Sequence, residues 1–155
     1  MQYEKPEKKS GKIILMLVLV LAVAAVFKFF YVDGMEIAKK LREYENAEFT
    51  IEKYESIENK VAEVKLSSTQ RDALITLFAE AHFRVVLADT VYSSDLTRYD
   101  IFVNGTVGEL SGTLFSIGIT GGKYLSATDM FNGKFGRIYD KRWNEKLDEI
   151  LTISD

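Results

Sequence analysis

The stretch GTLFSIGITGGKYLSAT, residues 112–128, contains two segments typical of β-strands, with a pair of glycines between them. Gly121 and Gly122 occupy the connection. Glycine at both central positions of a two-residue connection permits the positive φ angles of a tight hairpin turn. The stretch therefore predicts two antiparallel strands.

Strand patterns continue on both sides of this hairpin. Upstream, FRVVLADTVY (83–92) and RYDIFV (98–103) are rich in β-branched and aromatic residues, and polar residues 93–95 separate them. Downstream, Asn132–Gly133 is a second turn pair and leads into KFGRIYD (134–140).

Two more strands are predicted nearer the N-terminus. Phe49 and Ile51 alternate with polar residues in AEFTIEKY, and the same alternation recurs over 62–66. Residues 56–59 form the expected turn between them. Both segments have the period of strands with one buried face.

Two segments have helical spacing instead. In SSTQRDALITLFAEAHF (67–83) the apolar stripe is expected to comprise Leu74, Leu77, Phe78 and Ala81, and the residues expected to face water are Gln70, Arg71, Thr76 and Glu80. Ser67 and Gln70 have the spacing of a capping box. In KRWNEKLDEIL (141–151) the apolar face comprises Trp143, Leu147, Ile150 and Leu151.

The resulting order over residues 47–155 is β-β-α-β-β-β-β-β-α. Short connections favour antiparallel pairing, because parallel strands need long crossovers. We therefore expect an α+β fold, in which a mostly antiparallel sheet has two helices packed on one face.

The N-terminal part of the chain is dominated by an apolar run. Residues 13–32 read IILMLVLVLAVAAVFKFFYV, and their one charge is Lys28, near the end. A helix of about 20 residues spans the roughly 30 Å hydrocarbon core of a bilayer. We expect a transmembrane helix over 13–32, in contact with membrane lipid, between a basic tail (1–12) and a juxtamembrane stalk helix (33–46). The stalk helix is expected to extend the membrane helix and pack against the domain, with a partner-binding helix as the alternative.

Basic residues at the ends of the run predict its orientation. Four lysines and the amino group precede it, and an aromatic cluster at 27–31 follows at the far end. Positive flanks stay in the cytoplasm. The expectation is a single-pass signal-anchor protein of the cell membrane, with a cytoplasmic N-terminus and an extracytoplasmic domain over 47–155. A secretory signal cleaved after Ala24 is the alternative, and it stays open.

Charge and composition exclude several classes of function. From Gly34 onward 15 basic residues stand against 20 acidic ones, a net charge of −5. Nucleic acids and anionic lipids both require basic surfaces, so no nucleic-acid partner is expected. Seven glutamates between Glu43 and Glu63 either contact a basic partner or form a solvated face at a sheet edge. Cysteine is absent, which excludes disulfides and thiol chemistry.

No catalytic, cofactor-binding or metal site is predicted, and no cofactor. His82, the single histidine, is expected to cap the end of the first domain helix. Asp89, Asp95 and Asp100 are carboxylates without a partner suggested by spacing. Residues 118–124 lack the first glycine of a phosphate-binding loop and are interpreted as a hairpin. Residues 129–133 lack the ligands of a calcium loop.

Several hairpin and core positions carry a resemblance to a family. They are Tyr99-Asp100-Ile101, Ser116-Ile117, Gly121-Gly122-Lys123-Tyr124-Leu125 and Arg137-Ile138-Tyr139, followed by the closing helix with Leu147, Ile150 and Leu151. Over residues 48–152 the chain resembles small uncharacterised extracytoplasmic domains of Firmicutes, which follow membrane anchors or lipoprotein signals. The resemblance implies a bacterial extracytoplasmic domain and transfers no active site.

Three functions remain as hypotheses. The first is a membrane-anchored, non-enzymatic module that binds a protein partner in an envelope complex. The second is an assembly subunit that self-associates through its membrane helix, where Ala22, Ala24 and Ala25 would permit close approach. The third is an uncharacterised hydrolase, which would require a cleft holding His82 or two of the three aspartates.

Overall fold

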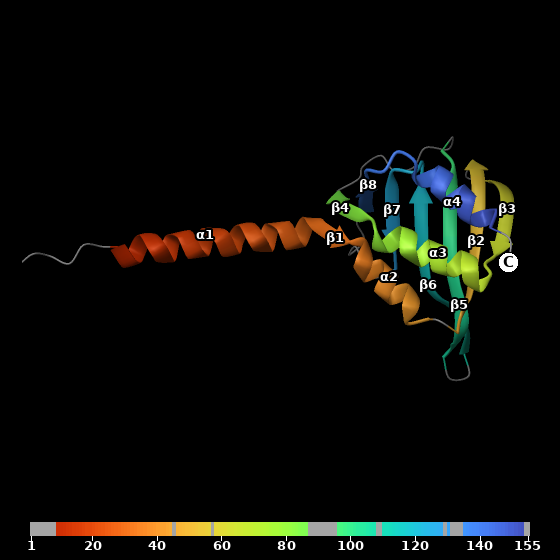
Figure 1. Cartoon of the computed structure of the whole chain (residues 1–155), viewed down its shortest axis with the longest axis horizontal. Helices are drawn as coiled ribbons and strands as arrows, with labels where there is room; N and C mark the ends of the chain where they lie inside the picture. Colours follow the sequence, from red (N-terminus) through yellow and green to blue (C-terminus); the bar gives the residue numbers. More distant parts are fainter. Residues whose placement is uncertain are drawn as a thin grey trace, which may run out of the picture. The chain divides into compact units, whose positions relative to one another are not determined.

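The computed structural model describes residues 9–44, 46–56, 58–86, 96–107, 110–128, 130 and 135–153, without the side chains of 9–10, 27–32, 107 and 110. The chain divides into two units, residues 1–30 and 31–155. Figure 1 shows the elements of both.

The first unit is the helix α1 (Lys9–Phe30). Its large apolar side chains between Ile13 and Val26 are at least half exposed around the helix. In the part of the chain that the structure describes, no helix is long and apolar enough to cross a membrane. The side chains of 27–32, the end of the expected span, lie outside that part.

The second unit is built on one sheet of eight strands, all paired antiparallel. The strands are β1 (Tyr31–Asp33), β2 (Glu48–Ser56), β3 (Asn59–Lys65), β4 (His82–Val86), β5 (Arg98–Val107), β6 (Leu110–Thr120), β7 (Tyr124–Ala127) and β8 (Phe135–Ile138). Their order across the sheet is β1-β4-β8-β7-β6-β5-β2-β3. The expected α+β class and antiparallel sheet are confirmed.

The hairpin that the sequence predicted joins β6 and β7. Gly121 and Gly122 have φ angles of +60° and +61°, and Lys123 N donates to Thr120 O at 3.1 Å. Both glycines therefore have the left-handed conformation that the turn requires. The predicted turns at 93–95 and 132–133 lie outside the described residues, as does the second half of the strand expected over 83–92.

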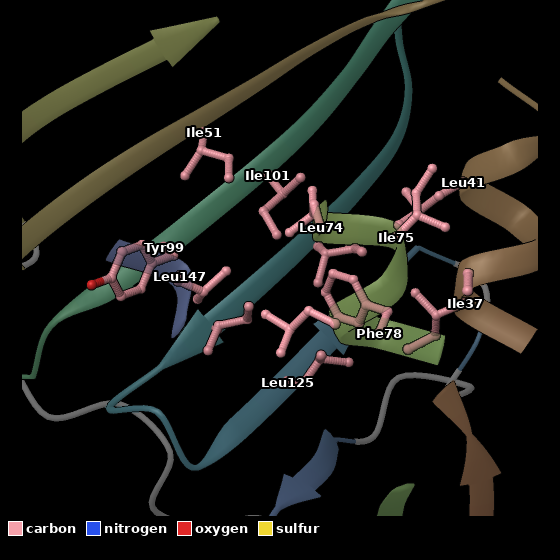
Figure 2. Packing of buried hydrophobic residues seen from close by; sticks show 14 of the residues in the cluster. Ile37, Leu41, Ile51, Leu74, Ile75, Phe78, Tyr99, Ile101, Leu125 and Leu147 are labelled. Carbon is pink, nitrogen blue, oxygen red and sulfur yellow. The ribbon is translucent and has the colours of Figure 1, made fainter. Parts of the chain in front are cut away.

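Three helices, rather than the expected two, contribute to the core on one face of the sheet: α2 (Gly34–Arg42), α3 (Ser68–Ala79) and α4 (Trp143–Leu151). Figure 2 shows how their apolar side chains meet those of the central strands. Ile51, Ile101 and Leu125 from the strands are almost fully buried with Leu74, Phe78 and Leu147 from the helices. Burying this shared apolar surface is the main favourable term for such a layered fold.

The additional helix α2 occupies the segment expected to form a stalk. Ile37, Ala38 and Leu41 are completely buried. The helix α2 therefore belongs to the core of the second unit, residues 31–155, which we call the compact unit. Its first residue must be glycine, because a Cβ at Gly34 would lie 2.0 Å from Phe78 O. Asp33 caps the helix by accepting a hydrogen bond from Met35 N at 3.1 Å.

Three predictions about single residues or helix ends were wrong. α1 ends at Phe30, because Tyr31–Asp33 form β1 and pair with β4. His82 does not end a helix: α3 stops at Ala79, and His82 is the first residue of β4. Gln70 was expected to face water but is only 6% exposed, because its side chain closes both the capping box and a contact with the C-terminal segment.

Candidate functional site

A pocket of about 370 Å³ lies where the end of α3, β4, β8 and the start of α4 meet. The residues that line it are Leu77, Glu80, Ala81, His82, Phe83, Ile138, Tyr139, Asp140, Trp143 and Lys146. They come from two stretches that are far apart in the sequence, 77–83 and 138–146, so only the folded chain forms the pocket.

Trp143 forms the buried part of this lining and is 2% exposed. Its ring contacts Phe78 and Phe83 edge-on, with ring centroids 5.6 and 5.9 Å away. Within the described part of the chain its Nε1 is buried without a hydrogen-bond partner. Aromatic rings in this arrangement make a rigid apolar base for the pocket.

The pocket also has charged groups. Lys146 Nζ donates to Asp140 Oδ2 at 2.6 Å, and Arg142 N donates to Asp140 Oδ1 at 2.9 Å. The hydrogen bond from Lys146, followed by that from Arg142 N, lowers the pKa of Asp140. The carboxylate therefore stays ionised, and charges of both signs lie beside the apolar base.

His82 lies in this pocket lining but is mostly exposed, and its Nδ1 is 3.7 Å from Asp33 Oδ1. The described part of the lining contains carboxylates but no serine, threonine or cysteine that could act as a nucleophile. Among the described residues, no group of three His, Asp or Glu could hold a metal ion. An apolar base with charges beside it is suited to binding a side chain or a small amphipathic group.

Asp100, the one of the three candidate aspartates that the structure describes, does not join His82. Asp100 is on β5 and pairs with Arg98 there, at 2.5 Å. Asp89 and Asp95 lie outside the described residues, as do most of residues 129–133. The segment 118–124 forms strand ends and the β6–β7 turn, as expected.

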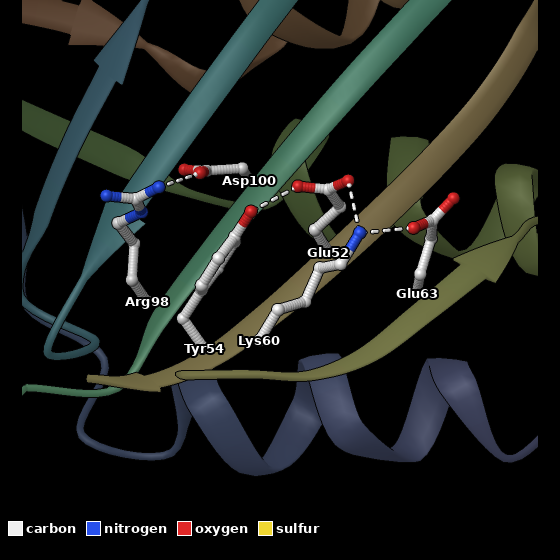
Figure 3. A network of polar contacts seen from close by, with 6 residues as sticks. All are labelled: Glu52, Tyr54, Lys60, Glu63, Arg98 and Asp100. Atoms are coloured by element: carbon white, nitrogen blue, oxygen red, sulfur yellow. Dashed lines mark hydrogen bonds and ion pairs between the residues drawn. The ribbon is translucent and has the colours of Figure 1, made fainter. Parts of the chain in front are cut away.

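A network of polar side chains lies on the sheet face opposite the helices, which we call the polar face (Figure 3). It is formed by Glu52, Tyr54, Lys60, Glu63, Arg98 and Asp100. These side chains reach that face because they alternate along their strands with the buried Ile51, Tyr99 and Ile101. Lys60 pairs with both Glu52 and Glu63, and Tyr54 Oη donates to Glu52 Oε2 at 2.5 Å.

The network shifts the pKa of several of its members. The hydrogen bond from Tyr54 lowers the pKa of Glu52 and raises that of Tyr54. Burial raises the pKa of Asp100, although the neighbouring Arg98 guanidinium opposes this shift. Arg98 also lies 4.6 Å from the Tyr54 ring centroid. The polar face thus links β2, β3 and β5 through contacts among its own side chains.

These pairs also bear on the glutamate-rich segment from Glu43 to Glu63. Glu43 pairs with Lys40, Glu48 with Lys65, and Glu52 and Glu63 with Lys60. Four of the seven carboxylates thus already have basic partners within the chain. This arrangement favours the solvated sheet edge over a surface that attracts a basic partner.

A further polar cluster connects the sheet to α4. Lys53 Nζ donates to both carboxylate oxygens of Asp148, at 2.8 and 2.9 Å, and Tyr99 Oη donates to Asp148 Oδ1 at 2.9 Å. Burial and this hydrogen bond raise the pKa of Tyr99 to about 12. The cluster fixes α4 against β2 and β5 at the border of the core.

Sequence reasoning nominated none of the pocket's charged residues except His82. Asp140 and Lys146 are six residues apart, and the pair forms only because the chain turns into α4 between them. Trp143 was recognised as a core residue, and its part in a pocket had no sequence signal. Comparisons of the chain with models of protein families, with curated proteins and with solved structures find no match.

Proposed function

We propose that this chain is a single-pass membrane protein whose compact unit binds a protein partner outside the cytoplasm. The observation that carries the proposal is the exposure of α1. From Ile13 to Val26 its large apolar side chains are between 50% and 71% exposed. Such a surface needs an apolar environment, and a helix that is apolar around its whole circumference is typical of membrane spans.

The sequence supplies the rest of the argument for anchoring. The apolar run continues to Val32, and 20 residues match the thickness of the hydrocarbon core. The four lysines before the run favour a cytoplasmic N-terminus. The compact unit begins at Tyr31, so no linker residues separate it from α1 in the sequence.

The pocket between α3, β4, β8 and α4 is the surface best suited to the partner. A buried aromatic base with charges beside it resembles the sites that receive a partner's anchoring side chain. The volume of about 370 Å³ accommodates one large side chain with part of its backbone. Glu80, Asp140 and Lys146 offer charges of both signs for orienting it.

Topology is tested by fusing alkaline phosphatase after Asp155. The fusion should be active, and external protease should digest the compact unit in intact protoplasts. A protected C-terminus with a full-length chain would overturn the extracytoplasmic location and the envelope partner together.

The pocket is tested by site-specific photo-cross-linking in living cells. A photo-reactive residue in place of Tyr139, which is 58% exposed in the pocket lining, should capture one partner at native expression. The matched control replaces Val61, which is 43% exposed on the distant edge strand β3. Equal capture from both positions, or none, would contradict binding through the pocket.

Self-association through α1 is the second candidate, because the same exposed apolar surface could be covered by another copy. The double variant Ala22→Leu with Ala25→Leu should then abolish the signal in a membrane two-hybrid assay. An unchanged signal would exclude the alanine stripe as the contact.

A further inference from the structure

A second groove, of about 330 Å³, lies on the other side of the β8–α4 connection and contains an unusual concentration of positive charge. Its lining residues are Gly121, Gly122, Lys123, Arg137, Ile138, Tyr139, Asp140, Lys141 and Asn144. Three of these residues are basic, in a unit (residues 31–155) whose net charge is −6. We call this site the basic groove.

The three cations of the basic groove have no acidic partner among the described residues. Within the described ranges, ten ion pairs involve other lysines and arginines, but none involves Lys123, Arg137 or Lys141. The one carboxylate in the lining, Asp140, is bonded to Lys146 Nζ and Arg142 N. The three positive charges are therefore not neutralised within the groove.

The pairing of strands β4 and β8 adds a fourth cation next to these. Arg84 lies directly opposite Arg137 in the register, and like charges in this position destabilise a sheet. Arg84, too, has no ion pair with a described residue. A bound anion would remove this repulsion. The arginine pair thus favours an anion independently of the shape of the groove.

The backbone and side chains around Arg137 suit a planar or tetrahedral oxyanion. Arg137 Cζ lies 5.6 Å from the centroid of the Tyr139 ring. A guanidinium held against an aromatic face keeps its N–H edges free to donate in pairs to an oxyanion.

The β6–β7 turn brings Asn144 to the wall of the groove. A Cβ at Gly122 would lie only 2.7 Å from Asn144 Oδ1, so the glycine permits this close approach of the side-chain amide. Asn144 is in the first turn of α4, and its Oδ1 is buried without a described partner. A rotated amide would present its N–H groups instead, and the positive end of the α4 dipole lies on the same side.

From these contacts we propose that the basic groove binds a phosphate group, as a phosphate monoester or diphosphate, with Arg137 as the bidentate donor and Lys123 and Lys141 as point charges. Phosphate is favoured over a single carboxylate because three uncompensated cations match a multiply charged anion. The basic groove is a separate hollow from the pocket proposed for the partner, although Ile138, Tyr139 and Asp140 line both. The inference stands whether or not α1 enters a membrane.

The test is calorimetric titration of the full chain, in neutral detergent micelles, with inorganic pyrophosphate. Saturable binding is expected, and Arg137→Gln should weaken it at least about tenfold, because the substitution removes a bidentate pair of charge-assisted hydrogen bonds. The matched control is Arg142→Gln, which removes the same charge nearby. Arg142 pairs with Glu145 and Glu149 outside the groove, so its loss should change the affinity less than about twofold.

Two results would overturn the proposal: no saturable binding, or an equal loss of affinity in both variants, which would indicate unspecific attraction. The fluorescence of Trp143 checks that each variant is folded.

A second arm of the experiment adds phosphatidic acid to the micelles. A raised apparent Kd for pyrophosphate in the unmodified chain, absent in Arg137→Gln, supports a site filled by a lipid headgroup. An unchanged Kd supports a site filled by a soluble phosphate ester.

Discussion

Gln70 is the one buried polar side chain among the described residues of the core, and its replacement gives a sharp test of how the helices are fixed. Its Oε1 accepts a hydrogen bond from Ser67 N at 3.0 Å. Its Nε2 donates to Leu151 O at 3.3 Å and to Ile153 O at 3.2 Å. Gln70 thus joins the start of α3 to the end of α4 and the segment that follows it.

The expected cost of Gln70→Ala follows from these bonds. Three neutral hydrogen bonds contribute about 0.5–1.5 kcal/mol each. Alanine recovers roughly 0.5 kcal/mol through its better helix propensity. We expect the free energy of unfolding to fall by about 2–3 kcal/mol. Ser67→Ala, which removes only the cap acceptor for Gln70 N, should cost about 1 kcal/mol.

Urea unfolding of the full chain in detergent, followed by tryptophan fluorescence, measures both values. Trp143 is the single tryptophan and is buried at the start of α4, so it reports on the region that Gln70 stabilises. Thr69→Ala, at an exposed position of the same helical turn, is the control and should change the free energy by less than about 0.5 kcal/mol. If Gln70→Ala costs no more than Ser67→Ala, the two bonds to the C-terminal carbonyls do not contribute and the reasoning is refuted.

Three further predictions concern other parts of the compact unit. The pKa of Tyr99 is about 12 in the folded chain against an ordinary value of 10, so the stability that this group contributes is complete below pH 10 and is lost as the pH rises to about 12. Urea unfolding across this pH range should show a smaller loss of stability in Tyr99→Phe than in the unmodified chain. Equal losses in the two chains would contradict the raised pKa of Tyr99. Gly34→Ala should lower the free energy of unfolding by at least about 3 kcal/mol, because the new Cβ would overlap two carbonyl oxygens. The control is Gly112→Ala, where a Cβ meets nothing within 4 Å. A similar small effect of both substitutions would refute the steric argument. Arg98→Gln should raise the pKa of Asp100 further, since the guanidinium opposes the effect of burial; carboxyl NMR titration measures it, and an unchanged or lower pKa would count against the pairing.

The strands and helices of residues 48–151 were predictable because each has a local signal. Alternation placed Phe49 and Ile51 in the core, and the glycine pair fixed the β6–β7 turn. The role of α2 was not predictable in the same way. Ile37 and Leu41 have the spacing of an amphipathic helix, but the spacing does not say whether such a helix packs on its own domain or on another protein. The closure of β1 against β4 depends on non-local pairing, which periodicity does not encode.

The charged residues of the candidate sites were hidden for a related reason. Asp140 and Lys146 meet because the chain turns into α4 between them, and Arg84 and Arg137 meet through strand register across 53 positions of sequence. Neither contact has a characteristic spacing. The sequence therefore gave no reason to pair Asp140 with Lys146, or Arg84 with Arg137.

The distribution of charge within the compact unit separates the two proposed sites from the rest of its surface. Around the β3 edge, opposite charges are paired: Lys60 and Lys65 neutralise Glu63 and Glu48. Pairing of this kind leaves a hydrated edge that does not attract another strand. Around the β8–α4 connection the pattern is different. Lys123, Arg137 and Lys141 of the basic groove have no acidic partner among the described residues, and the neighbouring pocket has an apolar base. Uncompensated charge and exposed apolar surface both raise the free energy of an unliganded protein, and binding relieves them. Tyr139 and Asp140, which both sites share and which follow the end of β8, are therefore the positions where variants should affect binding while leaving the sheet intact.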